Sequence, residues 1–275
     1  MVKLVINDKQ KTEKLLTILK NLKSICINAN FQFTADGLYS QGMDGSHASL
    51  YELKITKDWF SSYELDHDEL LGLNTEMLFK AMNCVDDGQT VELSTQSIGG
   101  MEKFVLRLMD GKYNKDFEIP IMNIEEDQLE IPDAEWEVDV KMNSKDFGEM
   151  IKQLSTWGDN LNVKCSEDIS GLKFQSSGEN GKMTVDVKDE DINLMEMEED
   201  CNLDLNYSLS FMEMFSLFTK LNPEINVHYG EQKPMKVEFD LSDWKDKLEA
   251  EDEEEAEWRF ENSIKFFAAP KVEDF

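Results

Sequence analysis

The sequence lacks the features of a membrane or secreted protein. No apolar run approaches the ~20 residues that a membrane-spanning helix needs. Residues 1–14 hold no long apolar core, so a secretory signal is not expected. No two cysteines are close enough in sequence for a CxxC pair, and we expect a reduced intracellular chain without disulfide or zinc. The four cysteines are Cys26, Cys84, Cys165 and Cys201.

Catalytic motifs are also missing. The sequence has no GxxxxGK phosphate loop, no GxGxxG and no GxSxG elbow. The histidines His47, His67 and His228 are scattered, and no HExxH is present. Asp36 and Asp44 flank a glycine-containing stretch without the spacing of a calcium loop. We therefore expect no catalytic residue, no metal and no cofactor, and a protein that is not an enzyme.

Basic residues are scarce, with 28 against 58 acidic residues and a formal net charge of −30. A chain this acidic repels DNA phosphates unless its few lysines share one surface. The acid is concentrated in residues 189–200 and 249–257, with seven acidic residues in each. The 40% hydrophobic content and the 16 phenylalanines favour a folded core over disorder.

Hydrophobic periodicity predicts a repeated α+β unit. Helices are expected at 12–22, 75–83, 145–154 and 209–220, with Asn143 and Ser144 as a cap. Gly37 is followed by Leu-Tyr and Gly171, 134 residues later, by Leu-Lys. The alternative is a chance agreement in element order. Strands are expected at 2–6, 31–33, 38–39, 47–55, 91–93, 104–109, 136–142, 161–165, 171–176, 182–187, 225–229, 235–241 and 258–268.

Residues 120–134 separate the two copies. Prolines near both ends and an acidic middle are typical of an extended connector. Its many apolar residues predict that it is held against a surface. We expect an N-terminal domain at 1–120, a connector at 121–134 and a C-terminal domain at 135–275 with an acidic insertion at about 243–257.

Lysines lie on the polar faces of the expected helices. The first helix is net positive, and the others carry both signs. Lysine on a solvated helix face is commonplace. Helices that share one surface would instead create a local positive field that binds phosphates without reading bases. The lysines are Lys14, Lys20, Lys23, Lys80, Lys145, Lys152 and Lys220.

Four segments in order resemble the sliding clamps of the proliferating cell nuclear antigen family. Residues 36–50, Asp-Gly-Leu-Tyr-Ser-Gln-Gly-Met-Asp-Gly-Ser-His-Ala-Ser-Leu, are similar to the signature after the first helix in eukaryotic and viral members. Residues 129–132, Leu-Glu-Ile-Pro, resemble the end of the family's connector. Residues 155–159, Ser-Thr-Trp-Gly-Asp, and 269–274, Ala-Pro-Lys-Val-Glu-Asp, resemble two further motifs.

The resemblance implies a DNA-clamp fold and a head-to-tail homotrimer that encircles duplex DNA and tethers DNA polymerase. Each chain would have two similar domains, with two helices on the inner face of each and antiparallel sheets outside. Lys23, Lys80, Lys152 and Lys220 match the family's DNA-facing positions, and Lys14 and Lys20 add charge nearby. Non-basic residues stand where the family often has a basic one, so a less positive hole is expected: Leu16, Thr17, Asn83, Glu149 and Glu213.

The resemblance also implies a pocket for a short peptide of partner proteins, such as the polymerase and the clamp loader. Ring closure needs two unlike edges, for which we expect 112–118 and 181–188. Interface candidates are Lys112, Tyr113, Phe117, Met183, Val185 and Val187. The matching pocket positions are Met43, His47, Ile124, Leu129, Ile131, Pro132, Pro234, Ala269 and Pro270.

Other functions stay open at this point. The family location is the nucleus for a cellular protein, or sites of viral DNA replication for a viral one. A subunit of a heteromeric or checkpoint ring is the first alternative. An acidic metal-dependent nuclease is the second, because non-local carboxylates can converge in a fold. An acidic histone-chaperone-like protein is the third, disfavoured by the long ordered core.

Overall fold

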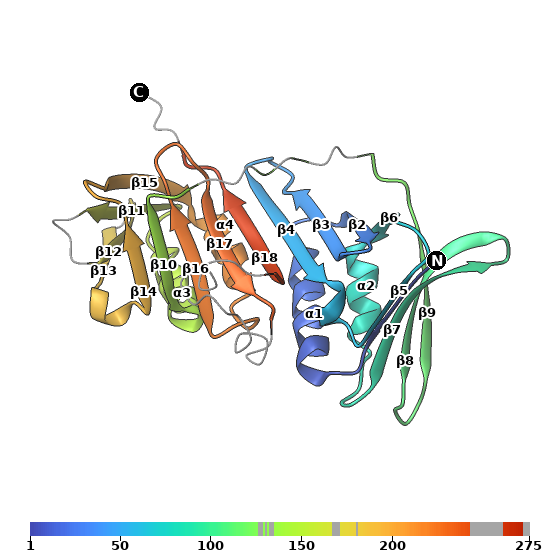
Figure 1. Ribbon diagram of the computed structural model, residues 1–275. Coiled ribbons are helices and arrows are strands. Elements are labelled where there is room, and N and C mark those ends of the chain that lie inside the picture. Colours follow the sequence, from blue (N-terminus) through green and yellow to red (C-terminus); the bar gives the residue numbers. More distant parts are fainter. Residues whose placement is uncertain are drawn as a thin grey trace. The chain divides into compact units, whose positions relative to one another are not determined.

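The computed structural model describes residues 1–125, 129, 131, 135–166, 171–179, 181–242 and 261–271. The chain divides into two compact units (Figure 1). The expected domain limits stay a prediction, since each unit also takes in short segments from elsewhere in the chain. None of the described helices is long and apolar enough to cross a bilayer. Unit 1 is Met1–Gly45, Glu52–Leu129 and Leu241–Ile264, and unit 2 is Ser46–Tyr51, Glu130–Asp240 and Lys265–Phe275.

The element order occurs twice, which confirms the expected repeat. Each copy runs strand, helix, three strands, a 3-10 turn, two strands, helix and three strands. The first copy is β1 (Val2–Ile6), α1 (Lys9–Leu22), β2 (Asn28–Thr34), β3 (Gly37–Met43), β4 (Ser49–Thr56), η1 (Lys57–Trp59), β5 (Ser62–Leu65), β6 (Glu69–Asn74), α2 (Thr75–Met82), β7 (Thr90–Ile98), β8 (Met101–Met109) and β9 (Lys115–Pro120). The second is β10 (Val138–Asn143), α3 (Ser144–Leu154), β11 (Asn160–Ser166), β12 (Leu172–Gly178), β13 (Gly181–Val187), η2 (Asp189–Asp191), β14 (Leu194–Met197), β15 (Asn202–Ser208), α4 (Leu209–Ser216), β16 (Glu224–Tyr229), β17 (Met235–Asp240) and β18 (Ser263–Ala268).

Strand pairing repeats as well. In unit 1, β1 lies between β5 and β7, and β2 lies between β3 and β6, all antiparallel. In unit 2, β10 lies between β14 and β16, and β11 between β12 and β15, again antiparallel. Strands β7, β8 and β9 follow one another in one sheet, as β16, β17 and β18 do in another. Together with the four helices, this confirms the expected α+β class.

The glycines that marked the repeat have the same structural task in both copies. A Cβ atom on Gly37 would lie 2.1 Å from the Ile55 carbonyl oxygen, and one on Gly171 would lie 2.0 Å from that of Val187. No side chain fits at such a distance. Both positions therefore need glycine where the β2–β3 turn or its counterpart passes a neighbouring strand end.

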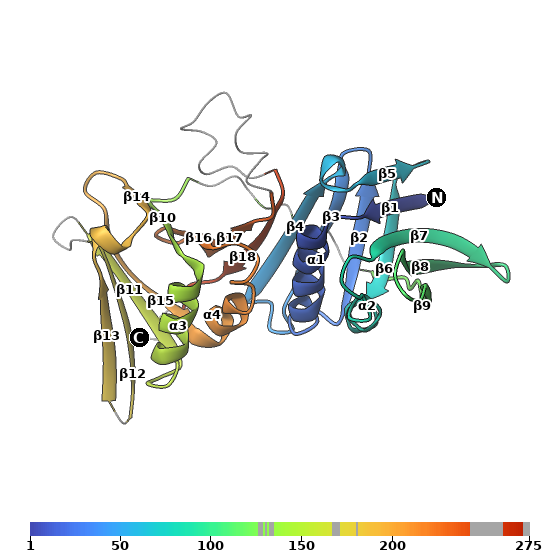
Figure 2. The same cartoon turned by 90° about the horizontal axis from the view of Figure 1, so that it is seen from below.

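The helices form where periodicity placed them. In α1, the apolar stripe of Leu15, Ile18, Leu19 and Leu22 is buried. Figures 1 and 2 show α1 beside α2 in unit 1 and α3 beside α4 in unit 2. The expected cap of α3 is confirmed, because the Asn143 side chain accepts hydrogen bonds from two backbone N–H groups, 3.0 and 3.1 Å away.

Two expected element bounds need correction. Helix α4 ends at Ser216 and not at 220, because the chain tightens there into i to i+3 bonds such as Phe218 N–H to Phe215 oxygen, 3.0 Å. The expected strand at 258–268 begins at Ser263 among the described residues. Cys84 is exposed, whereas Cys165 and Cys201 are buried, and no disulfide joins any of the four cysteines. Strands β5, β6, β14 and β15 were not anticipated.

The first part of the connector lies against unit 1, as its apolar residues predicted. Met122 forms a β-bridge with Gly72. A Cβ on Gly72 would lie 2.3 Å from the Met122 oxygen, so glycine permits this approach. Asn30 donates to the Ile124 carbonyl at 3.2 Å, and Gln41 donates to that of Leu129 at 3.3 Å.

Candidate DNA and partner surfaces

The helix lysines differ in what they contact. Lys14 donates to the carbonyls of Leu241 and Ser242 at 2.8 and 3.0 Å, so its ammonium group serves contacts inside unit 1. Lys20 is exposed in the last turn of α1. Lys23 follows it, with its ammonium nitrogen 4.5 Å from the Phe79 ring centroid.

The remaining lysines are exposed and lie among acidic side chains. On α2, Lys80 pairs with Glu76 at 2.9 Å, and this pair lowers the pKa of Glu76. Lys152 lies in the last turn of α3 and Lys220 follows α4. Glu213 accepts a hydrogen bond from the Ser155 hydroxyl at 2.7 Å. The positive charge of these helices was predicted to be weak, and acidic side chains beside the lysines agree with that prediction.

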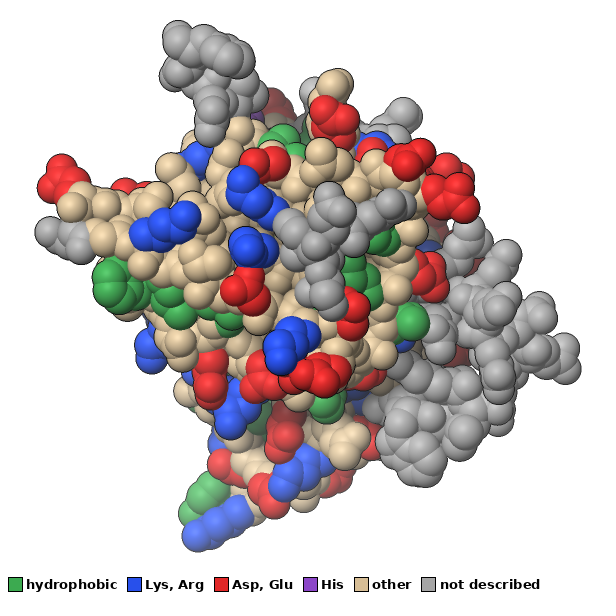
Figure 3. Space-filling model, turned by 90° about the vertical axis from the view of Figure 1, so that its left-hand side faces the viewer, with side chains coloured by type: hydrophobic (Ala, Val, Ile, Leu, Met, Phe, Trp, Pro, Cys, Tyr) green, Lys and Arg blue, Asp and Glu red, His purple; other side chains and the backbone are tan. Residues whose placement is uncertain are grey.

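A cavity of about 860 Å³ lies between α3 and β13 in unit 2. Trp157 is 43% exposed at this cavity, and a Cβ on Gly181 would lie 2.9 Å from its ring. Figure 3, which views the molecule from the β13 side, shows basic and acidic side chains interspersed with a short hydrophobic strip. The lining residues are Glu149, Lys152, Gln153, Thr156, Trp157, Lys182, Met183 and Thr184.

The two expected edge strands have an open side among the described residues. Strand β13 pairs with β12 and β9 with β8, and each ends its sheet. Met183, Val185 and Val187 are half-buried on one face of β13. Phe117 is half-buried in β9, whereas Lys112 and Tyr113 precede this strand, and Tyr113 is 63% exposed.

The positions expected to form the peptide pocket belong to both units. In unit 1, Met43 and Ile124 are half-buried, and Leu129 is 41% exposed. In unit 2, Ala269 donates its N–H to the Ala48 carbonyl at 3.1 Å. Pro132 lies outside the described residues. The other positions in unit 2 are exposed (His47, Pro234, Ala269) or half-buried (Ile131, Pro270).

Sequence reasoning missed a residue beside this region. The Trp136 indole N–H donates to the Pro234 carbonyl at 3.2 Å. The Lys236 ammonium nitrogen lies 4.5 Å from the Trp136 ring centroid, and the His228 ring lies 5.5 Å from it. An aromatic residue just before a strand was the available signal. Trp136 thus fixes the backbone at a predicted pocket position.

The comparison with protein families identifies the family of the chain. Residues 6–130 match the family model described as proliferating cell nuclear antigen, N-terminal domain. Residues 130–248 match the one described as proliferating cell nuclear antigen, C-terminal domain. The chain belongs to the proliferating cell nuclear antigen family. This confirms the resemblance seen in the sequence and the two-domain clamp fold. Among the described residues, no group of three His, Cys, Asp or Glu side chains is placed to hold a metal ion.

Proposed function

We propose that this chain is a processivity clamp that encircles duplex DNA and tethers DNA polymerase and other replication or repair factors. The observation that supports it best is the match to both domains of the clamp family, in order, over residues 6–248. The clamp itself performs no chemistry in this proposal. It works at sites of DNA replication, in the nucleus for a cellular protein.

Contact with DNA is assigned to Lys20, Lys23, Lys80, Lys152 and Lys220. Lys14 is left out because two backbone carbonyls hold its ammonium group. Lysines at these positions attract phosphates without base specificity. Because the helices also carry acids such as Glu149 and Glu213, retention on DNA would rest on the closed ring more than on affinity.

Ring closure is assigned to the β9 edge of one copy and the β13 edge of the next. Two unlike edges on one chain generate a head-to-tail ring, and main-chain pairing removes both exposed edges. The cavity beside Trp157 would receive side chains that precede or lie in β9, with Tyr113 and Phe117 as the apolar candidates.

Partner proteins are assigned to the nine pocket positions that the family resemblance implies. Short peptides with an aliphatic residue and aromatics suit an apolar, partly exposed surface. The acidic insertion at 243–257 lies outside the described residues. Deletion of 249–257 tests whether it tunes partner choice: unchanged polymerase and loader binding would argue against that role.

Native mass spectrometry at micromolar concentration is the first test. We expect a mass of three chains, followed by stimulation of a DNA polymerase on primed circular DNA. The quadruple variant K23A/K80A/K152A/K220A should keep the trimeric mass but stimulate the polymerase less. A monomer at every concentration would refute the homomeric ring and favour a subunit of a heteromeric clamp. Full stimulation by the quadruple variant would refute the DNA assignment.

A further inference from the structure

Strand β9 presents acid at a predicted joining edge. Asp116 and Glu118 lie on one face of the strand with exposed fractions of 68% and 47%. The whole chain has a formal charge of −30. A second copy that approaches this edge would therefore meet like charge, which opposes association.

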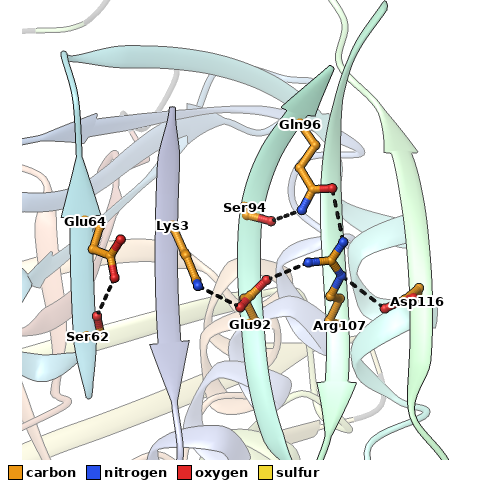
Figure 4. A network of polar contacts seen from close by, with 8 residues as sticks. All are labelled: Lys3, Ser62, Glu64, Glu92, Ser94, Gln96, Arg107 and Asp116. Carbon is orange, nitrogen blue, oxygen red and sulfur yellow. Dashed lines mark hydrogen bonds and ion pairs between the residues drawn. The ribbon is translucent and has the colours of Figure 1, made fainter. Parts of the chain in front are cut away.

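Arg107 of β8 compensates part of this negative charge. Its Nε lies 3.2 Å from an Asp116 oxygen, one terminal nitrogen lies 3.1 Å from Glu92, and the other lies 3.1 Å from the Gln96 amide oxygen. Lys3 adds a contact of 3.2 Å to Glu92. Figure 4 shows this row crossing β1, β7, β8 and β9. The guanidinium group of β8 thus ties the edge strand β9 to β7, and Lys3 extends the row from β7 to β1.

We propose that these cross-strand ion pairs neutralise the edge of β9 so that it can join a second copy of this acidic chain, with Arg107 as the principal residue. The inference rests on the proposed ring. It assigns Arg107 a positioning and charge-compensating role in assembly, distinct from the apolar contacts of the edge.

The choice of residue supports this role. Only two of the 28 basic positions are arginine, and Arg107 is the sole arginine among the described residues. Arginine presents five N–H donors in a fixed plane, whereas lysine is a point charge. Three acceptors on two strands need that geometry. A lysine at 107 would satisfy Asp116 or Glu92 less completely.

The charge balance at both edges fits a junction. Lys103 forms an ion pair with Glu118, so the four outward charges at the β9 edge (Lys103, Arg107, Asp116, Glu118) cancel. On the β13 side, Lys173 pairs with Asp186 at 3.2 Å. With Lys182, which is exposed, that edge has a formal charge of +1. Both edges are thus far less acidic than the chain as a whole, and the repulsion that opposes assembly comes from the remaining negative charge of the two copies.

The test is the monomer–trimer midpoint, measured by analytical ultracentrifugation at 50 and 500 mM NaCl. For R107Q we expect about three- to tenfold weaker assembly at 50 mM NaCl, since each exposed pair contributes little alone but the ring has several junctions. The deficit should shrink at 500 mM NaCl, where charges beyond a few ångströms are screened. The double variant R107Q/D116N should return to within about twofold of the original chain, since both charges of the pair are gone.

Matched variants keep the outcome clear. K233Q removes a comparable pair, Lys233–Glu137 at 3.2 Å, beside a sheet that contains neither β9 nor β13, and should not change assembly. Circular dichroism melting reports whether each variant is folded. Unchanged assembly of R107Q, or an equal loss at both salt concentrations without recovery in the double variant, overturns the inference while leaving the ring intact. A native chain that never assembles overturns both the ring and this inference.

Discussion

Strands β9 and β18 close the two copies of one topology, yet their side chains have different surroundings. Exposed and less exposed side chains alternate along β9, whose sequence is Lys-Asp-Phe-Glu-Ile-Pro, and Ile119 is its one buried residue. In β18, Ser-Ile-Lys-Phe-Phe-Ala is buried except for Lys265. The Phe266 ring lies 4.8 Å from Phe215, 4.6 Å from Phe218 and 6.2 Å from Phe239. The same fold position is therefore an edge in one unit and core in the other.

The difference shows that strands at the same position of a repeated topology can contribute differently to stability. The charged side chains that alternate along β9 keep one face of the strand exposed to solvent. The backbone N–H and C=O groups at its outer edge can therefore pair with another chain. The aromatic cluster around Phe266 anchors β18 in its own unit, because stacked and tilted rings add to area burial. An asymmetric pair of units is also what a head-to-tail assembly requires.

Truncation of the two phenylalanines should separate these roles most strongly. Phe266→Ala removes a side chain with no exposed surface and should cost about 3–5 kcal/mol of the free energy of unfolding. Phe117→Ala, at the half-buried edge position, should cost about 1 kcal/mol or less in the monomer, since little buried area is lost. Urea unfolding of each variant under monomeric conditions measures both. Equal losses would mean that the side chains of β9 stabilise their unit as strongly as those of β18.

The helices of the two units also differ in charge. Helix α1 has four lysines and one glutamate and α2 has one of each, which leaves +3 for unit 1. Helix α3 has two lysines and two acids and α4 has one glutamate, which leaves −1 for unit 2. Any phosphate that approaches these helices should therefore favour those of unit 1.

Paired lysine substitutions sharpen this contrast. K20A/K23A in unit 1 should weaken duplex binding about tenfold at 50 mM NaCl, whereas K152A/K220A in unit 2 should weaken it about threefold, because each lost phosphate contact removes a salt-dependent term. Fluorescence anisotropy over a salt series measures the affinity and its slope. K164A, on a sheet, serves as the control for net charge. A larger effect in unit 2 would reverse the assignment.

Corresponding sheets carry polar rows of different chemistry. In unit 1 the row runs through Arg107, which is always charged. In unit 2, His228 is buried and its Nδ1 contacts Asp139. Burial, more than any neighbour, lowers the pKa of His228 from its ordinary 6.5, although Asp139 opposes the shift. Of these two rows, the one in unit 2 therefore contains a group whose pKa lies below 6.5.

Acid should consequently weaken unit 2. Folded His228 stays neutral where the unfolded chain already binds a proton, so its stabilising contribution is complete above pH 6.5 and is lost as pH falls toward the folded pKa. Melting temperatures between pH 7.5 and 5.5 should fall by roughly 2–4 °C through this group, the change that about 1 kcal/mol produces in a domain of this size. His228→Gln should flatten that slope. Exposed His67→Gln is the matched control, and an unchanged slope in the first variant would contradict the assignment.

Local features were predictable because their causes are local. The stripe from Leu15 to Leu22, the Asn143 cap and the repeated glycines follow from spacing and backbone sterics. Strand β15 was missed although Leu203, Leu205 and Tyr207 alternate inward, since acidic residues precede it closely. Strand β6, Glu-Leu-Leu-Gly-Leu-Asn, lacks clear alternation altogether.

Contacts distant in sequence were not predictable. Lys14 was expected to add positive charge near the DNA-facing positions, but its partners Leu241 and Ser242 are more than 220 residues away. No role was predicted for Arg107, because its partners become neighbours only through the register of the strands. The pocket and interface residues came from the family resemblance, and their roles stay predictions.

The smallest difference between the units lies at the starts of α2 and α4, which correspond in the repeat. At the start of α2, the Asn74 side chain accepts a hydrogen bond from the Met77 N–H at 2.9 Å. At the start of α4, the Ser208 side chain makes no such capping bond, and its hydroxyl is hydrogen-bonded to the Ser210 hydroxyl. Asn74→Ala should cost about 0.5–1 kcal/mol, and Ser208→Ala should cost less than about 0.3 kcal/mol, because only the first leaves a helix N–H without its acceptor. Urea unfolding of both variants measures this. Equal costs would show that residue type at the cap, and not the observed bond, sets helix stability here.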